Sequence, residues 1–290
     1  MKLDNFILGH NSFFGINHAN YEKGKNVSEK FKNNYDKIVD ILLYANDKNI
    51  NNFMLSTLDE SEYLLNEINK TPLKESLNFY VLLPYINKYV RKSNEVGILG
   101  LIQEQLKKAP LIKNISYGID LSTSILRTDF KKTLSVLIDI ELQAFANVKK
   151  KIIILHDALT DILISLKRED VINYFIDYIK NKYKCDVGFA TKNFPSLNKF
   201  FGSFVDEVTI LTHANSIGFN MNPGKEEVEK EFLNSNYNII FMSILASGFL
   251  DYKIALDYLK KINLKKKKEF VIGCSSKKHI DDIYNYLKNK

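Results

Sequence analysis

The sequence contains no tryptophan, only five prolines and only two cysteines. Five prolines in 290 residues are too few for proline-rich linkers between domains. Cys185 and Cys274 are far apart and neither belongs to a CxxC pair, which argues against a zinc ribbon and a disulfide framework. Cysteine usage of this kind favours a reducing, cytoplasmic location.

Arginine is also scarce, although the chain is basic, with a net charge of +7 and a pI of 9.0. It occurs only at Arg91, Arg127 and Arg168, so lysine supplies nearly all of the positive charge. Proteins that read nucleic-acid grooves favour arginine, because its fork matches phosphate and guanine edges. The densest basic run, Lys265–Lys268, is interpreted as the end and exit of a surface helix. We therefore expect a solvated lysine surface and no nucleic-acid partner.

Long hydrophobic runs are absent as well. No segment approaches the roughly 18 apolar residues that a membrane span needs. The N-terminal MKLDNFILGHN is interrupted by Asp4, His10 and Asn11, so we do not expect a signal peptide. The composition is nevertheless 45% hydrophobic, with 19 Phe and 16 Tyr, which is enough for a large core.

Short apolar, β-rich runs alternate with amphipathic stretches of helical period along the chain. NYDKIVDILLYANDKN is the clearest helix, with an apolar face formed by Ile38, Ile41, Leu42 and Ala45. The predicted strands are Phe6–His10, Asn52–Thr57, Phe79–Pro84, Ile115–Ile119, Lys151–His156, Val187–Lys192, Glu207–His213, Ile239–Leu245 and Phe270–Cys274.

This alternation predicts an α/β fold, a (β/α)8 TIM barrel in a single domain over residues 1–290. Near-continuous apolar strands such as KKIIILH indicate a parallel sheet covered by helices on both faces. The prediction has one strand more than a barrel needs, and the weakest, Ile115–Ile119, is assigned to an insertion around residues 86–150. An open doubly wound sheet is the alternative. No GxGxxG or GxxxxGK[ST] motif follows any strand.

Four of the five histidines follow apolar strand-like runs: His10, His156, His213 and, more loosely, His18. In a parallel barrel the carboxyl ends of the strands meet at one face, where barrel enzymes keep their active sites. The sequence therefore predicts the location of a site more clearly than its chemistry.

The order of these segments resembles the aldo-keto reductase barrel. ILGHNSFFG is similar to that family's first-strand segment, and KIIILHDALTDIL to its fourth strand, which ends in histidine. VGFATKNFPSLNKFF resembles its fifth strand, NIIFMSILASGFLD its seventh, and VIGCSSKKHIDDIYNYL its eighth strand and cofactor-phosphate helix.

The resemblance implies a catalytic Asp, Tyr, Lys and His around a substrate carbonyl, with the Tyr hydroxyl donating the proton. Of these, only His156 is matched. The aspartate position falls at Ser56, or at Met54 if the register shifts, and the lysine position falls near Pro84. No tyrosine stands at the proton-donor position, and Tyr63 is interpreted as a packing residue. The implied fold is therefore kept, and the standard reductase reaction is not expected.

The resemblance also implies a nicotinamide cofactor, NADP. Gly273, Ser275, Ser276 and Lys277 would hold its phosphate at the N-terminus of the last helix, where free N–H groups favour an anion. This chemistry suits any phosphate. In the alternative interpretation, Ser276 only caps the helix.

Polar residues after the predicted strands are the candidate site residues. His10, His156 and Lys192 are the catalytic candidates, with Lys192 able to form a Schiff base if it is desolvated. Asp157 is interpreted as a helix cap or a second ligand. The substrate-binding candidates are Asn11, His18, Ser56, Asn193 and His213.

Three functions are compatible with these residues. The leading hypothesis is an enzyme acting on a small polar carbonyl or sugar-like substrate, with or without a phosphate, through proton transfer by His156. The second is a metal-assisted lyase, isomerase or hydrolase in which His10, His156 and His213 bind a divalent metal. The third is a non-catalytic barrel subunit. The expected partner is a small molecule, and no membrane partner is expected.

Overall fold

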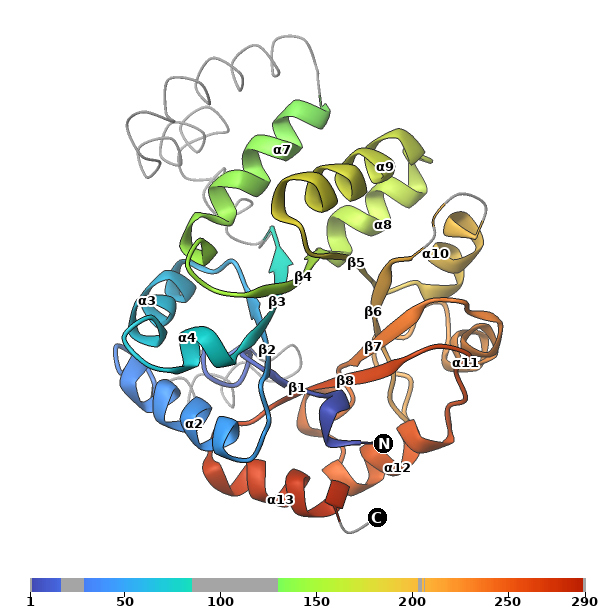
Figure 1. The fold of residues 1–290 in the computed structure, drawn as a ribbon. Helices are drawn as coiled ribbons and strands as arrows, with labels where there is room; N and C mark the ends of the chain where they lie inside the picture. Colours follow the sequence, from blue (N-terminus) through green and yellow to red (C-terminus); the bar gives the residue numbers. More distant parts are fainter. Residues whose placement is uncertain (1, 17–28, 85–129, 203–204, 206, 289–290) are drawn as a thin grey trace.

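The computed structural model describes residues 2–16, 29–84, 130–202, 205 and 207–288. Eight parallel strands close into a barrel in sequence order, with β1 hydrogen-bonded to both β2 and β8 (Figure 1). The (β/α)8 prediction is thus confirmed and the open sheet is wrong. The strands are β1 Phe6–Gly9, β2 Asn52–Ser56, β3 Asn78–Leu83, β4 Lys150–Leu155, β5 Asp186–Thr191, β6 Thr209–His213, β7 Asn238–Met242 and β8 Lys268–Gly273.

Helices surround the barrel as an outer ring (Figure 1). They are α2 Tyr35–Asp47, α3 Asp59–Ile68, α4 Leu73–Ser76, α7 Phe130–Glu141, α8 Asp157–Ser165, α9 Glu169–Tyr178, α10 Phe194–Phe201, α11 Lys225–Asn234, α12 Tyr252–Lys261 and α13 Lys277–Lys288. Shorter helical turns are η1 Leu3–Asn5 before β1, η2 Gln143–Phe145 before β4, η3 Ile179–Tyr183 before β5 and η4 Ala246–Gly248 after β7. The predicted strand Ile115–Ile119, residue His18 and most of the predicted insertion lie outside the described residues.

Strand residues alternate between two hydrophobic clusters, because successive side chains of a strand point to opposite faces. The larger cluster lies between strands and helices and includes Phe6, Leu8 and Ile153. The smaller one fills the barrel and contains Ile7, Met54, Tyr80, Ile152, Ile154, Ala190, Leu211 and Ile240. This alternation shows which end residues continue the inward-facing register.

The sequence analysis expected the lysine run Lys265–Lys268 to end a surface helix, and this expectation is wrong. Helix α12 already ends at Lys261, and Lys268 is the first residue of β8. The Lys268 amine donates to the carbonyl oxygens of Leu259 and Ile262 at 2.8 and 2.7 Å, so it caps the C-terminus of α12. The apolar residues after the run form part of strand β8 and pair with neighbouring strands of the barrel.

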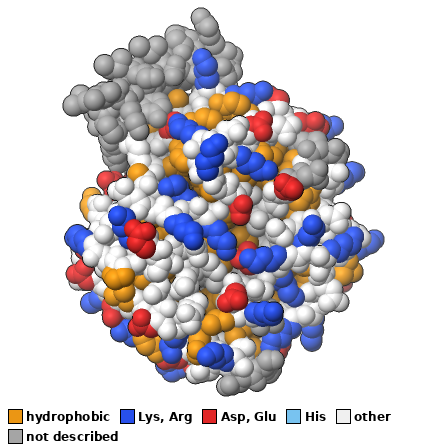
Figure 2. All heavy atoms as spheres, in the orientation of Figure 1, with side chains coloured by type: hydrophobic (Ala, Val, Ile, Leu, Met, Phe, Trp, Pro, Cys, Tyr) orange, Lys and Arg blue, Asp and Glu red, His pale blue; other side chains and the backbone are white. Residues whose placement is uncertain are grey.

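Charged side chains of both signs are interspersed on the face shown in Figure 2, with lysines and carboxylates side by side. Among the helices that the structure describes, none is long and apolar enough to cross a membrane.

Candidate functional site

The carboxyl ends of β4, β5 and β6 bring three predicted site residues to one end of the barrel, called here the mouth. His156, Lys192 and His213 each continue the inward register set by Ile154, Ala190 and Leu211. Their exposure differs. The His156 side chain is 21% exposed, that of Lys192 is 50% exposed, and His213 is buried.

Partial exposure continues on the strands that flank β4–β6 and on β8. Inward-facing Leu82 of β3, Met242 of β7 and Val271 of β8 are only partly buried, and Gly273 is exposed. Inward-facing apolar side chains in a closed barrel interior would be buried. These strands are therefore partly accessible to solvent.

His156 and Asp157 form a close pair at the start of α8. His156 Nδ1 lies 2.7 Å from Asp157 Oδ1, and the N–H of Ala158 donates to the same carboxylate oxygen at 2.8 Å. That N–H is 3.3 Å from His156 Nδ1, but the shorter contact and the negative charge favour the carboxylate as its acceptor. Nδ1 is then best assigned as a donor to Asp157, which leaves Nε2 with a lone pair.

Asp157 is ionised at neutral pH. Burial raises the pKa of Asp157. The hydrogen bond from His156 and the charges of His156 and Lys192 outweigh burial and lower the pKa to about 2. The sequence analysis interpreted Asp157 as a helix cap or a second ligand. The structure places His156 at the N-cap position, and Asp157 is the first residue of the helix.

Lys192 extends this group across to β5. Its amine lies 3.7 Å from Asp157 Oδ2. Its backbone N–H donates to Asp161 Oδ2 at 3.2 Å, and Asp161 Oδ1 accepts from Thr191 Oγ1 at 2.5 Å. Since the Lys192 side chain is half exposed, it lacks the dry surroundings that a Schiff-base lysine uses. Its position suits electrostatic binding of a substrate.

His10 takes a different position from the mouth residues. It continues the outward register of Phe6 and Leu8, is 4% exposed, and lies 5.9 Å from the ring of Phe14. Its Nδ1 is 3.0 Å from the carbonyl oxygen of Met54. Burial lowers the pKa of His10 to about 4, although the bond to Met54 opposes the shift. At neutral pH this imidazole is uncharged.

The remaining substrate-binding candidates that the structure describes contact residues close to them in the sequence. Asn11 is half-buried in the turn after β1. Ser56 is buried at the end of β2, where its carbonyl oxygen accepts from Ser61 Oγ at 2.7 Å. Asn193 caps α10, its Oδ1 accepting from the N–H of Ser196 at 3.1 Å. Whether any of them binds substrate stays a prediction.

The described part of the mouth has no tyrosine at the position of the reductase proton donor. Tyr63, interpreted from sequence as packed, is 60% exposed and stacks on Tyr35 with ring centroids 5.7 Å apart. Ser56 is the last residue of β2 and Pro84 follows β3, at the positions that the resemblance gives to the family's aspartate and lysine.

The predicted phosphate residues surround the N-terminus of α13. Ser276 accepts the N–H of His279 at 3.2 Å and so caps the helix, while Ser275 Oγ lies 3.4 Å from His279 Nδ1. Lys277 pairs with Asp40 of α2 at 2.7 Å. Next to them is a pocket of about 620 Å³ between α2 and α13, lined by Lys30, Phe31, Lys37, Asp40, Ile41, Ser276, Lys277 and Lys278.

Within the described ranges, no group of three or more His, Cys, Asp or Glu side chains is arranged to hold a metal. His10 faces outward, whereas His156 and His213 face the mouth, so these three do not form the metal site that the second hypothesis requires.

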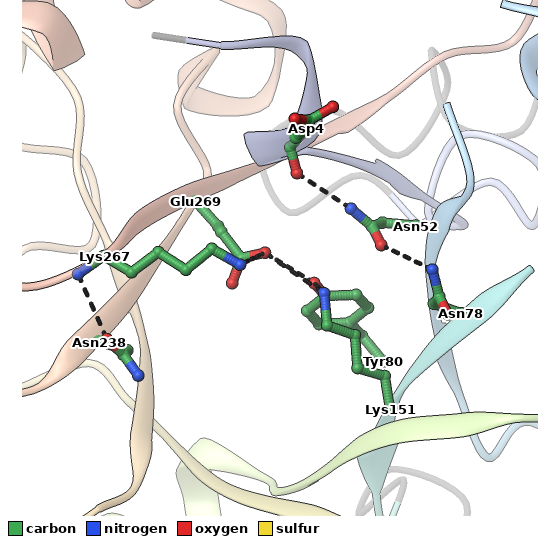
Figure 3. Close-up of polar contacts among 8 residues, drawn as sticks. All are labelled: Asp4, Asn52, Asn78, Tyr80, Lys151, Asn238, Lys267 and Glu269. Atoms are coloured by element: carbon green, nitrogen blue, oxygen red, sulfur yellow. Dashed lines mark hydrogen bonds and ion pairs between the residues drawn. The ribbon is translucent and has the colours of Figure 1, made fainter. Parts of the chain in front are cut away.

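Sequence reasoning missed a polar cluster at the other end of the barrel, called here the floor. Tyr80, Lys151, Lys267 and Glu269 meet across the barrel axis (Figure 3). Asn52 and Asn78 join at 3.3 Å beside them, and Asn52 donates to the carbonyl oxygen of Asp4. No sequence spacing links these residues, because barrel closure alone brings β3 and β8 to opposite sides of one interior.

Comparisons with known proteins support the fold but assign no reaction to the chain. No family model matches the chain, and no curated protein does. Two solved structures from Pseudomonas aeruginosa, both named "putative aldo-keto reductase", match with a TM-score of 0.59 and 10% sequence identity. The matches cover 98% of this chain and 90% and 89% of those chains. The protein has a divergent aldo-keto reductase-like (β/α)8 barrel fold.

Proposed function

We propose that the protein is an acid–base enzyme that acts on a small polar carbonyl or sugar-like substrate, with or without a phosphate group, and that His156 transfers the proton. The observation that carries this proposal is the 2.7 Å contact between His156 Nδ1 and Asp157 Oδ1. An ionised carboxylate on Nδ1 fixes the orientation and the tautomer of the imidazole. Nε2 is then the atom that accepts and returns a proton.

Lys192 supplies positive charge beside this pair. With its amine 3.7 Å from Asp157, it can bind a substrate phosphate or the oxygen on which negative charge develops. Proton removal next to a carbonyl creates such charge on the carbonyl oxygen. A histidine base and a lysine cation on neighbouring strands suit that reaction class.

Reduction by the standard reductase route is less well supported. The described mouth offers no tyrosine at the expected position, and His156 has the only matched catalytic counterpart. The fold similarity itself does not fix the activity.

NADP is the cofactor that the fold suggests, and the α13 region has donors suited to its phosphate. Ser276, Lys277 and Lys278 would hold a phosphate, with Lys37 on the facing wall of the pocket. Lys277 and Lys278 pair with Asp40 and Asp282 on the surface, where ion pairs contribute only about 0–1 kcal/mol and are easily exchanged. When bound, NADP would supply or accept a hydride.

Deuterium exchange tests the acid–base proposal. We expect the protein to catalyse exchange in D2O at carbons next to the carbonyl in a panel containing dihydroxyacetone phosphate, glyceraldehyde 3-phosphate and dihydroxyacetone, followed by proton NMR. His156→Gln should abolish it, and Asp157→Asn should reduce it. His279→Gln, an exposed histidine on α13, is the matched control. No exchange with any compound would favour the non-catalytic subunit.

Ligand-dependent unfolding tests NADP separately. At about 1 mM NADPH, a Kd of about 10 µM gives roughly 2.7 kcal/mol of added stability. Lys277→Gln should reduce that gain. An unchanged melting temperature would remove NADP from the proposal and leave the His156 chemistry standing.

A further inference from the structure

The floor cluster contains two amines, one carboxylate and one phenol, and the mouth chemistry uses none of them. Glu269 Oε1 accepts from Tyr80 Oη at 2.7 Å and from Lys267 Nζ at 2.9 Å. Lys151 Nζ donates to Tyr80 Oη at 2.5 Å and lies 3.8 Å from Glu269 (Figure 3). Tyr80 and Glu269 are buried, but the Lys151 and Lys267 side chains are 32% and 48% exposed. The amines are therefore reachable from outside.

A β-bulge aims Lys151 at this cluster. Phe79 pairs with Lys150 but Tyr80 pairs with Ile152, so Lys151 is an extra residue in β4. Lys150 points to the helix side, where its amine donates to the carbonyl oxygens of Phe145 and Val148 at 2.7 and 3.2 Å. Bulges commonly re-aim a side chain next to a functional site.

The hydrogen bonds form a proton path from the Lys151 ammonium to the Glu269 carboxylate. A proton can pass from Nζ to Tyr80 Oη while the phenol proton passes to Glu269 Oε1. The products are a neutral amine, an intact phenol and a neutral carboxylic acid. Burial lowers the pKa of Lys151, against the opposing charge of Glu269, which favours the same neutral amine.

We propose that Lys151 is a nucleophilic lysine that forms a Schiff base with a small aldehyde carrying an anionic group. The neutral Nζ attacks the aldehyde carbon, and the C=O electron pair moves to oxygen. Both amine protons then leave with that oxygen as water while the C=N bond forms, and the one proton held by Glu269 returns through Tyr80 to the imine nitrogen, which gives the protonated Schiff base. No oxidant or co-reactant is needed. The charges of Lys267 and Lys149 near Lys151 favour the anionic group.

The cluster is not a reductase site moved to the other end. A tyrosine that donates a proton to a substrate needs a pKa close to the working pH. Burial and the neighbouring Glu269 raise the pKa of Tyr80 far above its usual value. Tyr80 can relay a proton along existing bonds, but it is a poor acid.

Labelling with pyridoxal 5′-phosphate, followed by borohydride reduction and peptide mass spectrometry, tests the proposal. Burial lowers the pKa of both Lys150 and Lys151, so the hydrogen-bonded relay is what distinguishes them. We expect this relay to make labelling of Lys151 at least about tenfold faster than labelling of Lys150. Lys150 is a control within the same chain, since it is also partly buried but donates only to backbone carbonyls. Equal labelling of the two would overturn the proposal.

Variants separate the relay from simple accessibility. Tyr80→Phe keeps the ring, removes the hydroxyl, and should slow labelling of Lys151 about tenfold, with the melting temperature recorded to confirm folding. Unchanged labelling would contradict the relay. Lys267→Gln should raise the reagent concentration for half-maximal labelling, whereas Lys268→Gln should not. An unchanged half-saturation in Lys267→Gln would overturn the anionic requirement. These outcomes do not depend on His156.

Discussion

The mouth and the floor of the barrel are made by the two ends of the same strands, yet their polar groups are arranged oppositely. At the mouth, His156, Asp157 and Lys192 come from neighbouring strands and stay partly exposed. At the floor, Tyr80 and Glu269 come from opposite sides of the barrel and are buried against each other. Polar groups on one rim leave room for a ligand, whereas polar groups paired across the axis close the interior. This difference predicts separate effects on activity and stability.

The largest expected effect is on rate, at the mouth. His156→Gln should lower exchange activity by about 10²–10⁴-fold, because that is what a positioned proton-transfer group contributes. The free energy of unfolding should change by less than about 1.5 kcal/mol, since His156 occupies only the N-cap of α8. Exchange rates and urea unfolding of the same preparations would check both. A loss of activity in proportion to the loss of folded protein would contradict the expected difference between the mouth and the floor.

At the floor, the effect should fall on stability. Tyr80→Ala removes a fully buried ring and should cost about 3–5 kcal/mol in urea unfolding, as other buried aromatic truncations do. Activity per folded molecule should persist. Tyr80→Phe is the matched control and should cost less, about 1.5–3 kcal/mol, because it removes only the hydrogen bonds of the hydroxyl to charged groups. A comparable loss in both variants would mean that the polar bonds, and not packing, hold the floor.

His10 makes stability depend on pH. Its folded pKa of about 4 lies below the unfolded value of 6.5, so its contribution is complete above pH 6.5 and is lost as the pH falls toward 4. The shift corresponds to about 3 kcal/mol. His10→Asn keeps a donor for Met54 and does not titrate, so its unfolding free energy should fall less between pH 7 and 4. Parallel pH curves for wild type and variant would contradict this, and NMR titration of His10 gives a direct check.

The smallest effect concerns the rim of the mouth. Ser276→Ala removes the cap of α13 and should cost about 1 kcal/mol. Ser275→Ala, whose hydroxyl makes only a 3.4 Å contact, should cost less. Thermal unfolding of both variants checks the difference, and equal losses would show that Ser276 does not act as the cap.

The fold was predictable because strand patterns are local. KKIIILH and DEVTILTH carry their own periodicity, and the barrel strands begin and end within a few residues of the expected bounds. His156, Lys192 and His213 at the mouth also follow from local order, since each stands where its strand ends. Their partners were harder to predict. Asp157 was interpreted as a helix cap or a second ligand, because the sequence does not show that His156 takes the N-cap position of α8.

The floor cluster could not have been read from the sequence. Tyr80 and Glu269 are 189 positions apart, and their contact depends on β8 closing the barrel against β1. Lys151 reaches them only because of a one-residue bulge, which breaks the alternation that sequence patterns rely on. Lys267 was hidden in a lysine run that looked solvated. His10 shows the same limit, because one step of register separates the mouth from the layer under the helices.

The buried Tyr80–Glu269 pair also affects how substrate and product enter and leave the barrel. These side chains, together with the apolar cluster that fills the barrel, close its interior, so a ligand at the mouth cannot leave through the floor. Whatever reacts beside His156 must depart by the path along which it arrived, so an accumulating product occupies the entrance that the next substrate needs. Competitive inhibition by product is therefore the kinetic pattern that this architecture imposes on any chemistry at the mouth.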